Sequence, residues 1–401
     1  MGSLQGRAVA VKRLLQDFVT LAHREVDLLK DADDHPNVIR YYYQEAHANF
    51  LYIALELCPG SLADIVERPD KFREIAVSFS PKRAIRQITS GLRHLHALKI
   101  VHRDIKPQNI LISGAKKGES SGHRMLISDF GLCRKLELDQ TSFLPTTGGM
   151  MGVGTFGWRA PEILRGEVKL DESIADDNSQ SSHDSVGTAT GSNHSGTGKP
   201  STRLTKSVDI FALGCLYYYC LTNGGHPFGE RFEREVNIMR NQKSLEGLEG
   251  FGEEGLEAVE LISSMLAPEA TDRFVGVSTL ACSSYSRVYL KKQRPDTTAC
   301  LMHPYFWDAG RRLGFLQDAS DRFEIMCRDP RDPHLVVLEN NAINVVGPDW
   351  PARLDKIFVE NLGKFRKYDG RSVQDLLRAL RNKVRVEASA WLFQSFLRVV
   401  F

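Results

Sequence analysis

One ten-residue run and a short motif after it constrain this chain more than any other feature of its sequence. The run HRDIKPQNIL covers 102–111, and DFG covers 129–131. Asp104 can orient an acceptor hydroxyl, Lys106 can steady a transferring phosphate, and Asn109 with Asp129 can hold magnesium against a triphosphate. A match of this length and order predicts a fold built to transfer a phosphoryl group.

Two further positions fit the same chemistry. Lys12 ends a Val-Ala-Val-Lys run, and Glu25 follows on an expected helix. Such a pair alone is more often a surface salt bridge. Ahead of the 102–111 run, however, Lys12 is expected to contact the α- and β-phosphates and Glu25 to orient it. The main chain from Glu56 to Cys58 is expected to meet adenine. No Gly-x-Gly-x-x-Gly motif precedes Lys12 in this sequence.

The segment between the DFG motif and Ala160-Pro161-Glu162 is expected to regulate the site. Arg103 can pair with a phosphorylated residue in this segment and order it. Thr155 is expected to shape the loop that receives a peptide substrate. His102 is interpreted as a structural histidine. The expected phosphorylation sites, the first of them preferred, are Ser142, Thr146 and Thr147.

The composition is typical of a soluble globular protein. The chain has 401 residues, 42% hydrophobic and 25% charged, with a net charge of +2, so it is not an obvious polyanion binder as a whole. The cysteines form no close CxxC pair, which favours reduced thiols in the cytosol or nucleus over disulfides or zinc. The longest apolar run, 210–221, is too short to cross a bilayer.

Periodicity predicts a small sheet with one helix, followed by a helical region. Strands are expected at 7–12, 38–43 and 50–57, and the first helix at 18–30. Ser80 and Pro81 form a helix start. Later helices are expected at 82–98, 208–221, 257–266, 310–328 and 373–383. Asp209 is expected to be a buried anchor at the start of the 208–221 helix.

Two internal stretches interrupt this pattern. Residues 171–202 are rich in Ser, Gly, Thr, Asn and Asp and predict a disordered insertion, read as a solvated spacer or a carrier of phosphorylated serines. Residues 274–293 are interpreted as an extra segment, because the flanking sequence would read smoothly from Arg273 to Arg294 without them.

The second half carries a specific family resemblance. The runs HPYFW at 303–307, LGKFRKY at 362–368 and DLLRALRNK at 375–383, together with ELC at 56–58 and DFGLC at 129–133, resemble the inositol-requiring enzyme family. Its members are endoplasmic-reticulum stress sensors with a cytosolic serine/threonine kinase fused to an endoribonuclease. The resemblance is fungal-like and covers nearly the whole chain, and it implies the cytosolic part, truncated at both ends. The 2-5A-dependent ribonuclease looks more distant.

The resemblance implies a metal-free nuclease in which an RNA 2′-hydroxyl attacks the adjacent phosphate. By motif, Tyr368 matches an acid–base tyrosine, and Arg381 with Asn382 match the phosphate-binding pair. Eight Lys or Arg against two Asp in 361–385 independently suit an RNA backbone, although a solvated helix face has the same composition. The family's histidine falls where Val386 stands, so we expect an impaired nuclease.

These observations predict an α+β chain: a bilobal protein kinase fold, with a small β-rich N-lobe and a helical C-lobe, followed by an incomplete all-α kinase-extension nuclease domain. The expected boundaries are 1–307 (lobes 1–57 and 61–307), 308–383 for the partial nuclease domain and 384–401 for a tail unlike the family.

The expected function is a serine/threonine kinase that uses ATP and Mg²⁺, autophosphorylates in trans and controls a nuclease of the unfolded-protein response. Two alternatives stay open: an impaired nucleotide-binding scaffold that dimerises, and a plain cytosolic kinase. Expected partners are a second copy and an RNA stem-loop, with no DNA. The family resemblance implies the cytosolic face of the endoplasmic reticulum membrane, reached only through a segment upstream of this chain, which by itself is expected to be soluble and cytoplasmic.

Overall fold

The computed structural model describes residues 1–15, 19–114, 123–136, 154–165, 205–268, 294–354, 356–363 and 367–386. Contacts within the chain divide it into two compact units, 1–275 with 291–301, and 276–290 with 302–401. The predicted insertions at 171–202 and 274–293 and the tail beyond 386 lie outside the described residues. The domain boundaries drawn from the sequence therefore remain predictions.

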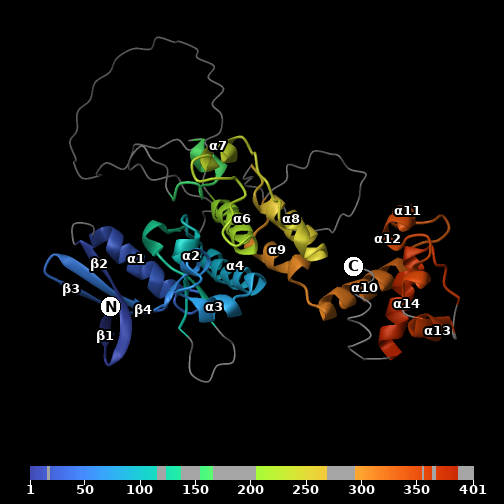
Figure 1. The fold of residues 1–401 in the computed structure, drawn as a ribbon, viewed down its shortest axis with the longest axis horizontal. Coiled ribbons are helices and arrows are strands. Elements are labelled where there is room, and N and C mark those ends of the chain that lie inside the picture. Colours follow the sequence, from blue (N-terminus) through green and yellow to red (C-terminus); the bar gives the residue numbers. More distant parts are fainter. Residues whose placement is uncertain are drawn as a thin grey trace, which may run out of the picture. The chain divides into compact units, whose positions relative to one another are not determined.

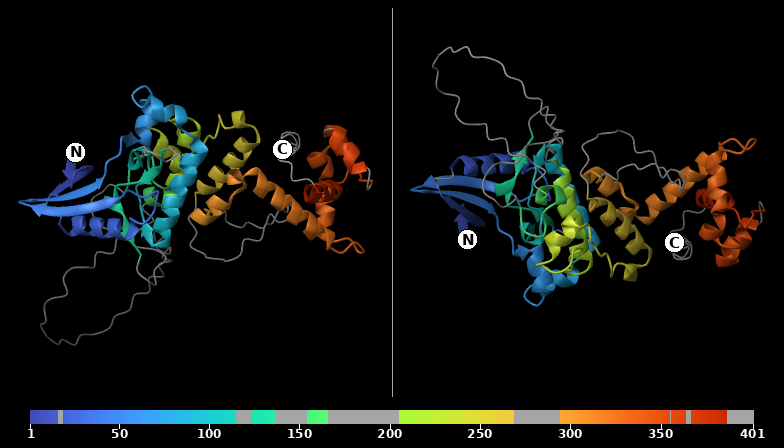
Figure 2. Two further views of the ribbon diagram at one scale, coloured as in Figure 1. Left: turned by 90° about the horizontal axis from the view of Figure 1, so that it is seen from below. Right: turned by 90° about the horizontal axis from the view of Figure 1, so that it is seen from above.

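The first unit begins with an antiparallel four-stranded sheet in the order β1-β2-β4-β3. Its strands are β1 (Gly2–Leu4), β2 (Arg7–Leu15), β3 (Tyr41–His47) and β4 (Phe50–Glu56). Helix α1 (Val19–Ala32) lies beside this sheet in Figures 1 and 2. Its Val26, Leu28 and Leu29 are buried, as the helical spacing predicts.

The strand predicted at 38–43 is placed wrongly. Val38 instead forms an isolated parallel bridge with Ile127, and the amide of Ile39 donates to the carbonyl oxygen of Ile127. The apolar run therefore joins two different structures, because its first residues pair with β8 and its last residues begin β3. The strand at 50–57 is confirmed as β4, which pairs with β2 and β3.

A helical region follows the sheet. Helix α4 (Pro81–Ala97) begins as predicted, since the hydroxyl of Ser80 accepts a hydrogen bond from the amide of Arg83. Helix α6 (Ser207–Leu221) is buried along nearly its whole length and packs against α4 and against α8 (Glu253–Met265). Helix α8 begins four residues before the predicted start. The remaining helices of this unit are α2 (Leu62–Glu67), α3 (Arg73–Ser78), α5 (Pro161–Leu164), α7 (Arg234–Met239) and α9 (Thr297–Met302), of which all but the last residue falls in this unit.

Short strands hold the catalytic-type loops between the sheet and these helices. Strands β5 (Gly60–Ser61), β7 (Ile110–Ile112) and β8 (Met125–Ile127) form a three-stranded sheet. Strands β6 (Ile100–Val101) and β9 (Arg134–Lys135) pair with each other. The 102–109 loop leaves β6 and enters β7, while the DFG motif separates β8 from β9, so both motifs are tied to this strand set.

In its described residues the second unit is almost wholly helical. Its helices are α10 (Ala309–Glu324), α11 (Pro333–Asn340), α12 (Ala342–Val346), α13 (Lys356–Gly363) and α14 (Val373–Val386). Helix α14 packs against α10, α11 and α12 and contributes Leu376, Ala379 and Leu380 to a core that also holds Trp350. Helix α10 ends four residues before its predicted end. No described helix of the chain is both long and apolar enough to cross a membrane.

Candidate active site

Lys12 joins the sheet, helix α1 and the DFG motif. Its Nζ lies 2.6 Å from Oε1 of Glu25 and 3.0 Å from Oδ1 of Asp129. Burial would lower the pKa of Lys12, but the two carboxylates outweigh it and hold that pKa above its ordinary value. Burial would raise the pKa of Asp129, but the Lys12 ammonium holds it below its ordinary range. Both groups therefore stay charged near neutral pH.

Asp104 lies at the centre of a second network. Its Oδ2 accepts hydrogen bonds from Nζ of Lys106 at 2.7 Å and from Nδ2 of Asn109 at 2.8 Å. Its Oδ1 accepts from the hydroxyl of Thr155 at 2.6 Å, and that hydroxyl accepts from Lys106. The carboxylate is only 6% exposed, so its orientation is fixed by neighbours rather than by water.

Thr155 has a role that the sequence analysis did not assign. We expected it to shape the peptide-binding loop, and the structure also places it across the Asp104–Lys106 pair. The separation of 51 residues from Asp104 hides this contact in the sequence.

Asp209 of α6 anchors the loop that carries Asp104. This fully buried carboxylate accepts from the amides of His102 at 2.8 Å and Arg103 at 2.7 Å, and it pairs with His96. Arg103 has a positive φ of 67°, a strained conformation that these bonds hold in place. The predictions of a buried Asp209 and a structural His102 agree with this geometry, because His102 is buried against Phe130 and bonds to the carbonyl of Ser128.

Asn109 and Asp129 suit a magnesium ion chemically. The amide nitrogen of Asn109 donates to the main-chain carbonyl and to Oδ2 of Asp104, which leaves its Oδ1 as the atom available to a cation. Asp129 adds a carboxylate, and the backbone of this residue has a positive φ of 63°. Carboxylate and amide oxygens are the ligands that a hard divalent cation prefers.

The predicted adenine-binding segment follows β4. The carboxylate of Glu56 lies 3.5 Å from Arg124, and the amide of Glu56 donates to the carbonyl of Arg40. The thiol of Cys58 lies 3.8 Å from the carbonyl oxygen of Glu56. Burial, reinforced by the Glu56 carboxylate, raises the pKa of Cys58 to about 12, so this thiol is protonated at neutral pH.

Arg103 belongs to a cluster of positive charge. Burial, then the neighbouring Arg134 and Arg24, lowers the pKa of Arg103 to about 10. Burial and Arg24 likewise lower the pKa of Arg134. The sequence analysis missed Arg24 and Arg134, although Arg24 directly precedes Glu25. The predicted phosphorylation sites Ser142, Thr146 and Thr147 lie outside the described residues.

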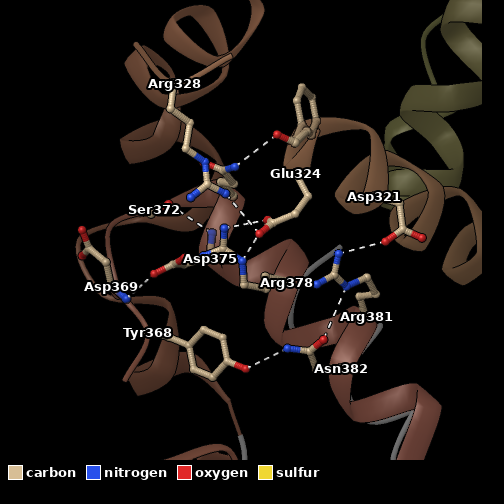
Figure 3. A network of polar contacts seen from close by, with 12 residues as sticks. Asp321, Glu324, Arg328, Tyr368, Asp369, Ser372, Asp375, Arg378, Arg381 and Asn382 are labelled. Atoms are coloured by element: carbon tan, nitrogen blue, oxygen red, sulfur yellow. Dashed lines mark hydrogen bonds and ion pairs between the residues drawn. The ribbon is translucent and has the colours of Figure 1, made fainter. Parts of the chain in front are cut away.

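The second unit brings the predicted nuclease residues together (Figure 3). Nδ2 of Asn382 donates to the hydroxyl of Tyr368 at 3.3 Å, and Nε of Arg381 lies 3.4 Å from Oδ1 of Asn382. Arg381 also pairs with Asp321 of α10 at 2.8 Å. Position 386 is the last in α14, four residues beyond Asn382. Residues this far apart share a face of a helix.

The comparisons with known proteins match both units. Residues 2–176 match the family described as protein kinase domain, and residues 312–385 match ribonuclease 2-5A. The chain is 46% identical over 391 residues to the serine/threonine-protein kinase/endoribonuclease ireA of Aspergillus fumigatus, covering 95% of this chain and 32% of that protein.

Two further relatives come from other organisms. The sensor for unfolded proteins in the ER ire1 of Schizosaccharomyces pombe is 41% identical, with 95% of this chain and 32% of that protein covered. The serine/threonine-protein kinase/endoribonuclease IRE2 of Homo sapiens is 38% identical, with 95% and 34% covered. The chain thus spans about a third of the length of the relatives it matches.

Proposed function

The chain belongs to the inositol-requiring enzyme family of paired kinases and endoribonucleases, and we propose that it transfers the γ-phosphate of ATP to serine or threonine residues. The observation that carries this proposal is the Asp104 carboxylate held by Lys106, Asn109 and Thr155. Asp104 orients the attacking hydroxyl and accepts its proton. Lys106 neutralises charge on the transferring phosphoryl group, because its ammonium lies beside that carboxylate.

A protein kinase domain implies ATP and Mg²⁺ in general. We assign Asn109 and Asp129 as the magnesium ligands, because their oxygens suit a hard cation. The ion would offset negative charge on the β- and γ-phosphates. Lys12, fixed by Glu25, holds the α- and β-phosphates, and the main chain from Glu56 to Cys58 receives the adenine.

The proposed substrate of the kinase is a second copy of the chain, phosphorylated in trans on the segment that carries Ser142, Thr146 and Thr147. The cluster of Arg24, Arg103 and Arg134 supports this proposal, since a phosphate would relieve the repulsion among its guanidinium groups. Phosphorylation and nucleotide binding would then favour a homodimer or larger oligomer.

The proposed output is an endoribonuclease of the unfolded-protein response that starts noncanonical messenger splicing on an RNA stem-loop. Tyr368 would act in proton transfer, while Arg381 and Asn382 would hold the scissile phosphate. Their mutual contacts in the second unit support this grouping. Val386 has no titratable group, so the nuclease of this chain is impaired. The protein would work at the cytosolic face of the endoplasmic reticulum membrane.

A scaffold without catalysis is the second candidate, and the valine at 386 favours it. One paired experiment separates the candidates: ATP turnover and stem-loop cleavage are measured on the same preparation, with Asp104→Asn as the kinase-dead control. Turnover that disappears in the control, with weak or absent cleavage, supports the proposed kinase. Absence of both activities supports the scaffold. Efficient cleavage by the unaltered chain contradicts our interpretation of Val386.

A further inference from the structure

The peptide that follows Tyr368 is held from its amide side by Asp375. Oδ2 of Asp375 accepts a hydrogen bond from the amide of Asp369 at 2.8 Å, although Asp375 lies six residues later in the first turn of α14 (Figure 3). Its Oδ1 accepts from Nη1 of Arg378 at 2.5 Å. One carboxylate therefore ties the Tyr368 loop to the helix that carries Arg381 and Asn382.

Arg378 extends this connection to a second helix. Its Nε and Nη2 donate to Oε2 of Glu324 in α10 at 3.0 and 2.6 Å. Arg378 is only 7% exposed, so its buried guanidinium is held between two carboxylates, those of Glu324 and Asp375. The hydrogen bond from Arg378 also holds the pKa of Glu324 below its ordinary value. The position of Asp375 is thus set by α10 as well as by α14.

Trp350 holds the same peptide from its carbonyl side. The indole Nε1 of Trp350 donates to the carbonyl oxygen of Asp369 at 3.0 Å, and the amide of Trp350 donates to that of Gly370 at 2.9 Å. The Trp350 ring meets the Tyr368 ring edge-on at 6.3 Å. A Cβ on Gly370 would lie 1.9 Å from Oδ1 of Asp349, so a side chain at this position would displace the Asp349 carboxylate. Residue 369 is therefore fixed at both its amide and its carbonyl.

We propose that Asp375 is the positioning residue for Tyr368, and that Arg378 and Glu324 act through it to set the distance between the Tyr368 hydroxyl and Asn382. This inference rests on the proposed nuclease function, because it concerns the residue that would exchange a proton with the RNA. The family resemblance supplies Tyr368, Arg381 and Asn382 but assigns no role to Asp375, Arg378 or Glu324.

A purely structural role for Asp375 predicts something different. An acidic residue in the first turn of a helix stabilises that helix by charge alone. Glu339 of α11 provides a matched comparison, because it also holds the start of α14: its carboxylate accepts from the Ser372 hydroxyl and from the amides of Val373 and Gln374. Within the described residues Glu339 bonds to Ser372 and to the first turn of α14, not to Tyr368 or Asp369.

The test uses the full chain labelled with ¹³Cζ-tyrosine, with the Tyr368 signal assigned from Tyr368→Phe. We expect Asp375→Asn to shift or broaden that signal, because an amide cannot accept from both the Asp369 amide and Arg378 as a carboxylate does. We expect Glu339→Gln to lower the melting temperature and leave the signal in place. An unchanged signal in Asp375→Asn, or an equal change in Glu339→Gln, overturns the proposal. If Asp375→Asn does not fold, Arg378→Lys carries the same comparison.

A second readout measures the affinity for RNA. The probe is a fluorescent stem-loop with a 2′-deoxy nucleotide at the cleavage position, which cannot be cut. We expect binding to weaken by about tenfold in Asp375→Asn, equivalent to about 1.4 kcal/mol, and to change little in Glu339→Gln. Equal weakening in both variants overturns the proposal. If the unaltered chain does not bind the probe, the proposed nuclease function fails, and the tyrosine signal still decides whether Asp375 positions Tyr368.

Discussion

The ammonium of Lys12 lies 2.6 Å from the carboxylate of Glu25, although these residues belong to a strand and a helix and stand thirteen positions apart. Glu25 is 5% exposed, whereas Lys12 retains partial access to solvent. The buried Glu25 carboxylate therefore fixes the position of the Lys12 ammonium. The same ammonium contacts Asp129, so helix α1 and the DFG motif meet at one side chain.

This relationship predicts the effect of Glu25→Gln. The variant keeps the shape of the side chain but removes the charge that fixes Lys12. The ammonium is then no longer held in position to contact the α- and β-phosphates of ATP. Because small misplacements of a positioning group cost as much as about 100-fold in rate, we expect ATP turnover at saturating ATP to fall by about 10- to 100-fold. Turnover is measured beside Glu254→Gln, which removes an exposed partner of Lys82 and should leave the rate unchanged. Equal rates in all three proteins would contradict the role of Glu25.

A second prediction concerns Thr155. Its hydroxyl donates to Asp104 and accepts from Lys106, so Thr155→Val removes both bonds with little change in volume. We expect turnover to fall by about tenfold or more, since each lost bond to a charged group is worth about 1.5–3 kcal/mol. Thr155→Ser restores the hydroxyl and should recover most of the rate. A valine variant as active as the serine variant would show that the hydroxyl is dispensable.

Local signals predicted much of the kinase-type unit. The helix start at Ser80, the buried Asp209 and the pairing of Lys12 with Glu25 all follow from short motifs, because each depends on a familiar spacing within the fold. The strand at 38–43 was wrong for a physical reason. Val38 and Ile39 are buried by pairing with Ile127, and an apolar pattern gives no information about which strand covers it.

Long-range contacts account for what the sequence did not reveal. Thr155 and Arg134 reach their neighbours only after the chain has folded, and neither belongs to the short motifs that located the site. Arg294 shows the same limit, because it forms two hydrogen bonds with the buried carboxylate of Glu162, 132 residues away. In the sequence Arg294 is marked only by its place directly after the unusual 274–293 stretch, which gives no hint of its contact with Glu162.

A third prediction tests the arginine cluster. If it receives a phosphorylated residue, phosphatase treatment should slow turnover of the unaltered chain. Arg134→Gln weakens the cluster, so the ratio of phosphorylated to dephosphorylated activity should fall toward one. Arg40→Gln, which removes an exposed partner of Asp33, should keep the full ratio. A ratio that is unchanged in Arg134→Gln would place the phosphate elsewhere.

A fourth prediction concerns His226, which is buried beside Trp158. Burial, with Arg234 adding to it, lowers the pKa of His226 to about 3 from the ordinary 6.5. Between these values the unfolded chain binds a proton that the folded chain does not. Stability is therefore complete above pH 6.5 and falls as the pH drops, by up to about 1.4 kcal/mol per pH unit.

The check is the melting temperature of the kinase-type unit between pH 7 and pH 4.5. His226→Asn can still accept from the amide of Phe228, as Nδ1 of His226 does, but it cannot titrate. We expect this variant to be less stable at pH 7 and to show a shallower decline with acid. Parallel declines in the two proteins would assign the acid sensitivity to other groups.

The last prediction follows from position 386. This position is four residues beyond Asn382 at the end of α14, so an imidazole there would share a helix face with Asn382. General acid–base catalysis contributes about 10²- to 10⁴-fold, and we therefore expect Val386→His to raise stem-loop cleavage by at least about 100-fold. The matched control is Lys383→His, which adds the same imidazole one residue from Asn382 and two from Arg381, where it faces neither, and should leave cleavage at the starting level. Cleavage is measured between pH 6 and 8, where a gain that depends on an imidazole should vary with pH. Equal gains in cleavage from the two histidines would mean that a nearby imidazole supports cleavage whatever its position on the helix. No gain from Val386→His would place the defect of the nuclease outside this position.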